Sequence, residues 1–320
     1  MSSGEAIKRR GNKLRYGKWG YIFLSPFYIT FFIFTFVPLI TTFYYSFFEY
    51  FKKGVLYVGP NFVGIENYEY VFDSDLGKYI GNTFWMWVLG FIPQIVMALV
   101  LAAWFSNMRL KIKAQGFFKT IIYAPNMIMA ASIAMLFFTI LSGTGPVNQL
   151  LMEMGAIDEP IMFMQEYESK LIVIAFINFF MWYGNTTILL LAGMLGIDGS
   201  IYEAASIDGA TGFQSFRKIT IPMLRPIMVY VLIMSLIGGL QMYDVPTIIT
   251  DKNSGNPDRK LMTIIMYLQN FLRQSNLGRG GAVAVILFAV TGVFSFLVFK
   301  TVMSGDKDNK KKKRARRGKK

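Results

Sequence analysis

The sequence predicts an all-α, polytopic membrane protein with six transmembrane helices, and three observations carry this prediction. Hydrophobic residues make up 54% of the 320 residues and charged residues only 16%, whereas a soluble domain carries about 25% charged residues. The apolar residues cluster in runs that reach the roughly 20 residues needed to cross a bilayer. Runs such as "YITFFIFTFVPLITTFYYSFF" lack the polar face that a helix on a soluble core would show.

Each apolar run predicts one span, and together the spans form a transmembrane domain over residues 19–303. The six runs cover residues 19–47, 81–106, 117–142, 171–196, 223–245 and 282–303. The first run is longer than the core of a signal peptide, and no small-residue cleavage site follows it, so we expect it to be retained. Residues 1–18 form a basic N-terminus. The basic tail at 304–320 is expected to be disordered because its like charges repel.

Lysine and arginine lie mainly before the first run, between the second and third, between the fourth and fifth, and after the sixth. Because cytoplasmic loops carry an excess of these residues, both termini and the loop at 197–222 are expected in the cytoplasm. The net charge of +14 also suits nucleic-acid-binding proteins, but the tail has no aromatic residues that would stack on bases. We expect no nucleic-acid partner and a tail attracted to anionic membrane lipids.

The chain contains no cysteine and no histidine. This excludes zinc–thiolate sites and cysteine nucleophiles, and it removes the usual general base at neutral pH. We therefore expect no catalytic residue and no metal site. A P-loop is also missing, because its closest approach, Gly11 to Trp19, has five residues between the glycines and ends in tryptophan where serine or threonine is needed.

The loop at 197–222 is polar and helix-forming. Ser200 and Glu203 match a capping box, S-x-x-E, and Thr211 and Gln214 match a second, T-x-x-Q. Gly209 between them allows the first helix to end. The loop is thus predicted to form two short helices joined by a turn. On this pattern alone, a contact surface for a partner and a simple connection between two spans remain equally open.

The order of residues in this loop resembles the EAA motif, which marks the membrane subunits of binding-protein-dependent ABC importers. The matching residues are Glu203, Ala204, Ala205, Asp208, Gly209, Ala210, Phe216, Ile219, Pro222 and Pro226. Ile221 departs from the motif's usual leucine, and Ser254–Pro257 departs from a Gly-Gly-Pro turn, which weakens any assignment of the substrate. Segments between residues 19 and 300 are similar to the same family, most of all to the first permease of maltose- or glycerol-phosphate-type transporters.

This resemblance implies that the chain is not an enzyme but a permease subunit of a carbohydrate importer in the bacterial cytoplasmic membrane. Its implied partners are a second, related permease, two ATPase subunits that bind ATP and Mg, and an extracellular solute-binding protein that delivers a sugar or oligosaccharide. The chain itself is then expected to bind no cofactor. The outer segments 48–80 and 246–281 are expected to help dock the solute-binding protein.

The resemblance also assigns roles within the loop, which is the coupling helix of this family. Glu203 is expected to make the main polar or ionic contact with the ATPase. Gly209 is expected to make the bend, and Ala204 and Ala205 to pack into a groove on the ATPase.

Polar residues in the hydrocarbon layer are costly and face a cavity or a neighbouring helix. Asn178, Trp182 and Asn185 are spaced four and three residues apart, which places them on one helical face. Amides that bond hydroxyls and an indole that covers a sugar ring suit a carbohydrate path, but buried amides also bond helices to each other, and both alternatives stay open. The path candidates are Trp87, Gln94, Asn126, Asn178, Trp182, Asn185, Gln241 and Asp244. Asp244 is alternatively a gate residue or an ordinary interfacial carboxylate.

Two other classes of function compete with the importer. A membrane enzyme would need a catalytic constellation, and the chain has no histidine, cysteine or G-x-S-x-G motif to build one. A stand-alone secondary carrier or channel needs no ATPase partner, and it leaves the two capping boxes and the EAA spacing unexplained.

Overall fold

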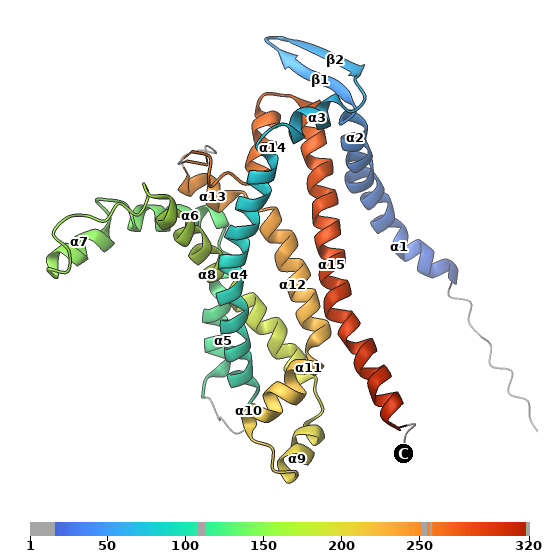
Figure 1. Ribbon diagram of the computed structural model, residues 1–320, viewed down its shortest axis with the longest axis vertical. Coiled ribbons are helices and arrows are strands. Elements are labelled where there is room, and N and C mark those ends of the chain that lie inside the picture. Colours follow the sequence, from blue (N-terminus) through green and yellow to red (C-terminus); the bar gives the residue numbers. More distant parts are fainter. Residues whose placement is uncertain (1–16, 108–112, 251–254, 257, 318–320) are drawn as a thin grey trace, which may run out of the picture.

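The computed structural model describes residues 17–107, 113–250, 255–256 and 258–317. Over these residues the chain is mostly helical, and several long helices lie side by side in a bundle (Figure 1). The predicted all-α membrane fold is confirmed. One two-stranded hairpin, which the sequence analysis did not predict, is added at one end of the bundle.

Five helical segments are long and apolar enough to cross a membrane, and they lie close to five of the six predicted runs. These segments are Lys18–Tyr45, Leu76–Ser106, Tyr167–Leu195, Arg225–Ile249 and Leu277–Thr301. They are formed by α1 (Gly17–Phe31), η1 (Phe32–Phe36) and α2 (Val37–Tyr45), by α4 (Leu76–Ser106), by α8 (Tyr167–Leu195), by α12 (Arg225–Leu240) with α13 (Asp244–Ile249), and by α15 (Leu277–Arg317).

The third run was expected as one span over 117–142; the segment is helical and apolar enough to cross a membrane only if its two parts, which are bent by 91° to each other, are taken together. It comprises α5 (Gln115–Tyr123), the 3₁₀ turn η2 (Ala124–Met127) and α6 (Ala130–Ile140). Pro125 lies in the turn, where it offers no backbone N–H to continue an α-helix, and Ile128 and Met129 then adopt extended backbone angles. With α6 turned aside in this way, it packs against α13.

The first span lies at the margin of the bundle. No residue in its apolar window is buried within the chain, and Figure 1 shows α1 diverging from the other long helices. Only its C-terminal part, α2, packs on α15, where the rings of Phe43 and Phe288 meet edge to face at 5.8 Å. Its exposed apolar surface is therefore left for lipid or for another subunit.

The centre of the bundle is the packing of α4 against α8. Glycines allow close approach on both helices: a Cβ at Gly90 would lie 3.0 Å from the carbonyl oxygen of Ala175. Gly184 lies still closer to η2 and α5, because a Cβ there would overlap the carbonyl oxygen of Ile122 at 1.9 Å. These positions fix how far α8 stands from its neighbours.

Replacing Gly184 with valine should lower the melting temperature of the purified protein. The added side chain must displace backbone rather than a flexible side-chain end, and overpacking of this kind costs about 1–3 kcal/mol. Gly292→Val is the matched control, because a Cβ at Gly292 meets open space. Equal melting temperatures for Gly184→Val and the wild type in detergent would show that α8 is not held as closely as described.

The two ends of the bundle differ in structure. At one end stand the hairpin of β1 (Phe48–Lys53) and β2 (Leu56–Phe62) and the helices α3 (Glu66–Phe72) and α14 (Ile264–Arg273), whereas α7 (Pro146–Glu153) projects sideways from the bundle (Figure 1). At the opposite end lies the connection between α8 and α12, and the C-terminal part of α15 runs toward this same end. Helix α15 continues as far as Arg317, whereas the sequence predicted disorder from residue 304.

Candidate coupling loop and transport path

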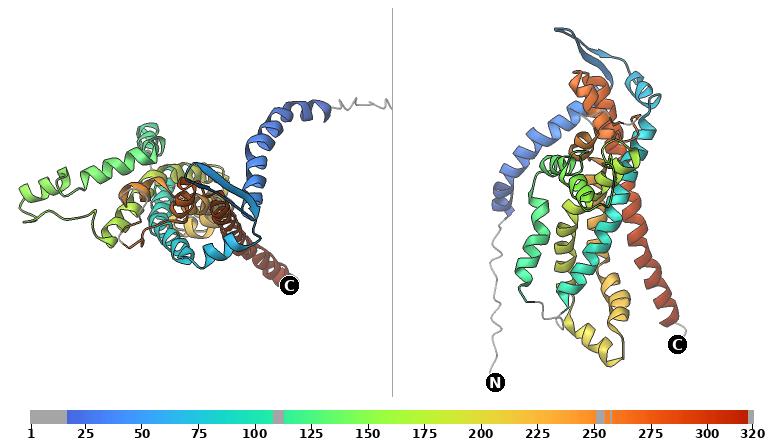
Figure 2. Two further views of the ribbon diagram at one scale, coloured as in Figure 1. Left: turned by 90° about the horizontal axis from the view of Figure 1, so that it is seen from above. Right: turned by 90° about the vertical axis from the view of Figure 1, so that its left-hand side faces the viewer.

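The connection between α8 and α12 is built from short helical elements, as the sequence predicted. They are α9 (Gly199–Ile207), α10 (Gly212–Ser215), the π-helical turn η3 (Phe216–Thr220) and α11 (Ile221–Met223). We call residues 197–222 the coupling loop. Figures 1 and 2 show it protruding from the bundle at the end opposite the hairpin.

The first helix of the loop is capped by Asp198, not by Ser200 as the sequence analysis predicted. The carboxylate of Asp198 accepts the backbone N–H of Ser200 at 2.9 Å, which lowers the pKa of this carboxyl. Ser200 is already within the helix, and a cap residue needs non-helical backbone angles. The cap is thus formed at neutral pH and is lost only as the pH falls through the lowered pKa.

The second predicted capping box is present. The hydroxyl of Thr211 accepts the backbone N–H of Gln214 at 3.3 Å, and the Gln214 side-chain oxygen accepts the Thr211 N–H at 2.9 Å. Reciprocal bonds of this kind satisfy two backbone donors at the helix start. Helix α10 therefore begins at a fixed point even though it is only four residues long.

The turn between α9 and α10 depends on Gly209, as predicted. Its φ of +77° lies in the left-handed region that favours glycine. The N–H of Ala210 bonds the carbonyl of Ala205 at 2.9 Å, and the N–H of Gly209 bonds that of Ser206 at 3.1 Å. This pair of bonds is the Schellman arrangement that ends a helix.

The coupling loop is tied to the spans by few but specific contacts. The Tyr202 hydroxyl is 2.8 Å from the hydroxyl of Thr220, which joins α9 to η3. Phe216 packs against a buried cluster that contains Leu224 and residues of α4 and α8. These contacts join α9, through η3, to the base of α12.

The predicted contact residues lie on the accessible surface of the loop to different degrees. Glu203, Ala204, Asp208, Gly209 and Pro222 are exposed, whereas Ala205, Ala210, Phe216 and Ile219 are half-buried. Two further residues of the loop, which the sequence analysis did not single out, carry large exposed apolar side chains: Ile207 is 87% exposed and Phe213 is 71% exposed. Their signal in the sequence is one large apolar residue on either side of Gly209 within a polar loop.

Four of the path candidates make hydrogen bonds within the chain. Gln94 donates to the Thr186 hydroxyl at 2.7 Å and is buried. The Trp87 indole donates to the Ser235 hydroxyl at 3.0 Å. These two bonds join α4 to α8 and α4 to α12, so they match the helix-bonding alternative.

Asn126 and Asn178 are also bonded. The Asn126 amide donates to the Met181 carbonyl at 3.3 Å, which links η2 to α8. The Asn178 amide donates to the carbonyl of Ile174 at 2.8 Å and lies 3.3 Å from the sulfur of Met242. The amide of Asn178 is half-buried, and it contacts the segment just after α12.

The remaining candidates are more accessible. Trp182 is 45% exposed on α8, Asn185 is half-buried, and both Gln241, just after α12, and Asp244, at the start of α13, are exposed. Because α8 is one continuous helix from Tyr167 to Leu195, Trp182 and Asn185 share the face on which Asn178 lies. A face that one chain leaves accessible is available to solute or to a second subunit.

Substitution of Gln94 and of Trp182 should separate the two alternatives. Gln94→Ala removes a buried interhelical bond, so we expect a stability loss of about 0.6–2 kcal/mol with the solute preference of uptake unchanged. Trp182→Ala should leave the melting temperature nearly unchanged and reduce uptake. Thermal unfolding and uptake competition among sugars measure both effects, and the reverse pattern would exchange the roles of the two residues.

The described residues thus form several helices long and apolar enough to span a membrane, with an exposed helical loop at one end of the bundle. The family of binding-protein-dependent transport system inner membrane components matches residues 94–305, and the chain belongs to this family. This confirms the resemblance drawn from the EAA motif.

Named relatives cover nearly the whole chain. It is 30% identical to the probable ABC transporter permease protein YesP of Bacillus subtilis (strain 168), over 94% of this chain and 95% of the relative. It is 29% identical to the arabinooligosaccharides transport system permease protein AraP of the same organism, over 88% of this chain and 87% of the relative. It is 30% identical to the lactose transport system permease protein LacF of Rhizobium radiobacter, over 91% of this chain and 96% of the relative.

A solved structure shares the fold. A chain of the bacterial alginate ABC transporter, in complex with an alginate pentasaccharide-bound periplasmic protein, matches with a TM-score of 0.71 at 23% identity. The match covers 92% of this chain and 97% of that one. The arrangement of spans and coupling loop is therefore the fold of an ABC transporter membrane chain.

Proposed function

We propose that this chain is a permease subunit of an ABC importer for a sugar or oligosaccharide. With a second, homologous permease it forms the path for a solute that an extracellular solute-binding protein delivers. Two separate ATPase subunits supply the energy and hold the ATP and Mg, so the chain itself binds no cofactor. The observation that carries the proposal is the coupling loop, an exposed and firmly capped helical element in a chain of this family. The names of the lactose and arabinooligosaccharide relatives support a carbohydrate solute.

The coupling loop offers the ATPase a mixed surface. Glu203 supplies a charge for an ionic contact, and the small side chains of Ala204 and Ala205 allow close backbone approach. Ile207 and Phe213 add exposed apolar area, and burial of such a side chain stabilises a contact by about 1.5–3 kcal/mol. A groove on the ATPase that covers both the α9 residues Glu203, Ala204 and Ala205 and the apolar side chains of Ile207 and Phe213 would hold α9 and α10 together.

ATP-driven movement of the ATPases would reach the spans through the contacts at the base of the loop. Tyr202 and Thr220 join α9 to η3, and Leu224 lies buried between α8 and α12, close to Gly193. Movement of the loop would therefore shift α8 and α12, the two helices that carry or adjoin most of the accessible path candidates. Those candidates, Trp182, Asn185 and Gln241, offer an aromatic face and amides to a polyhydroxyl solute.

The proposed orientation follows the distribution of positive charge. The coupling loop and both termini face the cytoplasm of a bacterial cell, and the hairpin end faces outward. The stand-alone carrier is the alternative, and it gives no reason for exposed Ile207 and Phe213 at the cytoplasmic end.

Reconstitution tests the proposal directly. Uptake into proteoliposomes that contain this chain, the second permease and the ATPase should require ATP and the loaded solute-binding protein. Sugar uptake by this chain alone, without ATP, would contradict the importer and establish the carrier.

A further inference from the structure

The fifth span is broken between α12 and α13. Helix α12 has 16 residues, which at 1.5 Å per residue span about 24 Å from the coupling loop. The break therefore lies near the outer side of a hydrocarbon layer of about 30 Å, where non-helical backbone is found buried in protein or lining a water-filled cavity. Gln241 and Asp244, on either side of the break, are both exposed, so the position of these two path candidates depends on its geometry.

Pro246 explains why the helix breaks at this point. In a continuous helix the Met242 carbonyl would accept the N–H of residue 246, but proline has no N–H and its ring clashes with that carbonyl. Met242 is buried, with only 8% of its surface exposed, and a buried carbonyl without a donor is costly. Another part of the chain must therefore supply the donor.

Thr263 supplies this donor from 21 residues further along the chain. Its hydroxyl donates to the Met242 carbonyl at 3.0 Å and accepts the backbone N–H of Met266 at 3.2 Å, as the N-cap of α14. Thr263 is fully buried. Because a hydroxyl has one hydrogen to donate and lone pairs to accept, a single oxygen atom joins the break to the start of α14.

The residues on both sides of Thr263 are held by α4. The N–H of Ile264 donates to the Thr83 hydroxyl at 3.1 Å, and the Asn82 amide donates to the Met262 carbonyl at 3.2 Å. Thr83, Met262 and Ile264 are all buried. The hydroxyl that bonds the break is thus fixed in position by a neighbouring span.

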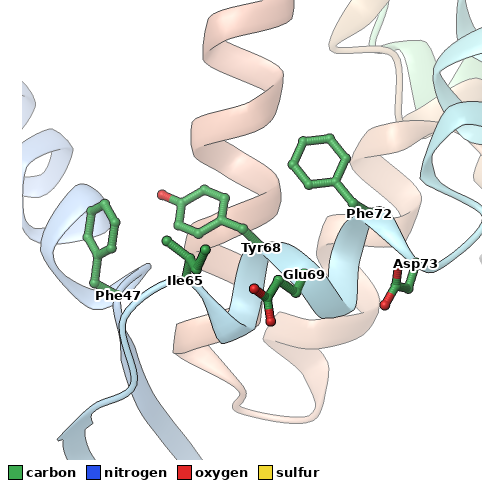
Figure 3. Close-up of a pocket in the computed structure, with 6 residues that line it drawn as sticks. All are labelled: Phe47, Ile65, Tyr68, Glu69, Phe72 and Asp73. Carbon is green, nitrogen blue, oxygen red and sulfur yellow. The ribbon is translucent and has the colours of Figure 1, made fainter.

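Helix α14 is fastened at two further points. The Tyr267 hydroxyl donates to the Ser74 hydroxyl at 2.9 Å, and Ser74 follows Asp73, which Figure 3 shows at the C-terminal end of α3. In the last turn of α14, the Arg273 guanidinium donates to the hydroxyl of Tyr243 at 2.9 Å. Since Tyr243 belongs to the break, α14 holds the break at both of its ends.

We propose that Thr263 is a positioning residue for the solute path. Its hydroxyl replaces at Met242 the backbone donor that Pro246 lacks, and it thereby fixes the break between α12 and α13. The inference rests on the proposed function, which makes this break a part of the path. Thr263 is buried away from the solute and acts through the Met242 carbonyl. Loss of the hydroxyl turns this carbonyl toward water and displaces Gln241 and Asp244.

The first test measures whether the Thr263 bond keeps the break closed to water. The chain contains no cysteine, so Met242→Cys introduces its only thiol and retains the backbone carbonyl. The complete transporter in nanodiscs is treated with a water-soluble maleimide, and labelling of this chain is followed on a gel. Adding Thr263→Val should raise the labelling rate at least fivefold, because valine is branched like threonine but cannot hydrogen-bond. Adding Thr263→Ser, which keeps the hydroxyl, should leave the rate nearly unchanged.

Thr187→Val is the matched control, because Thr187 is also fully buried but its hydroxyl donates to the Tyr183 carbonyl within α8. It should leave the labelling rate unchanged. An equal rise with the control, or no rise with Thr263→Val, would overturn the positioning role. If Thr263→Val does not assemble, Thr83→Val decides, since it removes a support of Thr263: a faster rate is expected, and an unchanged rate would overturn the role.

The second test measures transport with Met242 intact. Proteoliposomes receive the solute-binding protein and radiolabelled lactose or arabinotriose, whichever the wild type transports. Thr263→Val should lower the solute moved per ATP hydrolysed at least threefold, and Thr263→Ser should restore it. An unchanged ratio despite faster labelling would show that the break is no part of the path and would overturn the proposal. A wild type that moves no solute with ATP would refute the proposed function, whereas labelling would still decide whether Thr263 holds the break.

Discussion

Replacing Gly209 with valine should abolish most ATP-dependent uptake while the protein still inserts and purifies normally. Gly209 has a φ of +77°, and a residue with a side chain pays roughly 1–2 kcal/mol in this region, more when it is β-branched. The turn can relax only by moving α10 relative to α9. The two halves of the surface that we assign to the ATPase would then no longer match one groove.

The prediction concerns coupling, not folding, because nothing packs on Gly209 within 4 Å. Uptake and ATPase activity should therefore be measured together in proteoliposomes, and ATP hydrolysis should persist without solute movement. Gly199→Ala is the control within the same loop, since that glycine has open space and no left-handed angle. Normal uptake by Gly209→Val would show that the turn does not serve in coupling.

Replacing Ile207 with glutamate should weaken binding of the ATPase at least tenfold. The side chain is 87% exposed in the isolated chain, and the loss of about 1.5–3 kcal/mol of apolar burial corresponds to a factor of about 10 or more, since each 1.4 kcal/mol is tenfold. The new carboxylate adds a desolvation cost. Phe213→Glu, on the other side of the turn, should have an effect of similar size.

Ile207→Met keeps the apolar volume and should retain binding, which separates the loss of apolar contact from a general disturbance of α9. Binding can be measured as the amount of ATPase that remains with the solubilised permease across a titration. Full ATPase retention by Ile207→Glu would mean that this side chain faces water in the complex, and that the groove covers another face of the loop.

Local chemistry made the coupling loop predictable. Gly209 and the Thr211–Gln214 box act within a few residues of themselves, so their spacing in the sequence specifies their geometry. Asp198 was missed because serine and aspartate are both good caps, and Ser200 sits only two residues further along. Which of them becomes the cap depends on where α8 ends, and α8 ends at Leu195, with Gly196 as its C-cap.

Some features that sequence reasoning missed depend on contacts between distant parts of the chain. Gln94 bonds Thr186, 92 residues away, and no periodicity in either segment indicates that pairing. The bend between α5 and α6 has a local signal in Pro125, but nothing local indicates its angle of 91° or the packing of α6 on α13, which lies far along the chain. The hairpin also has a local signal, because Gly54 lies between two stretches that contain aromatic residues. This short signal directly follows a long apolar run, whose hydropathy dominates the pattern.

Binding of a separate ATPase by the coupling loop is tested most directly by co-purification. The chain should be purified from detergent-solubilised membranes with Glu203 intact and as Glu203→Lys. We predict that an ATPase and a second permease accompany the wild type and that charge reversal removes the ATPase. A chain that purifies alone in both forms, and still moves solute in liposomes, would contradict the importer and make this protein a carrier.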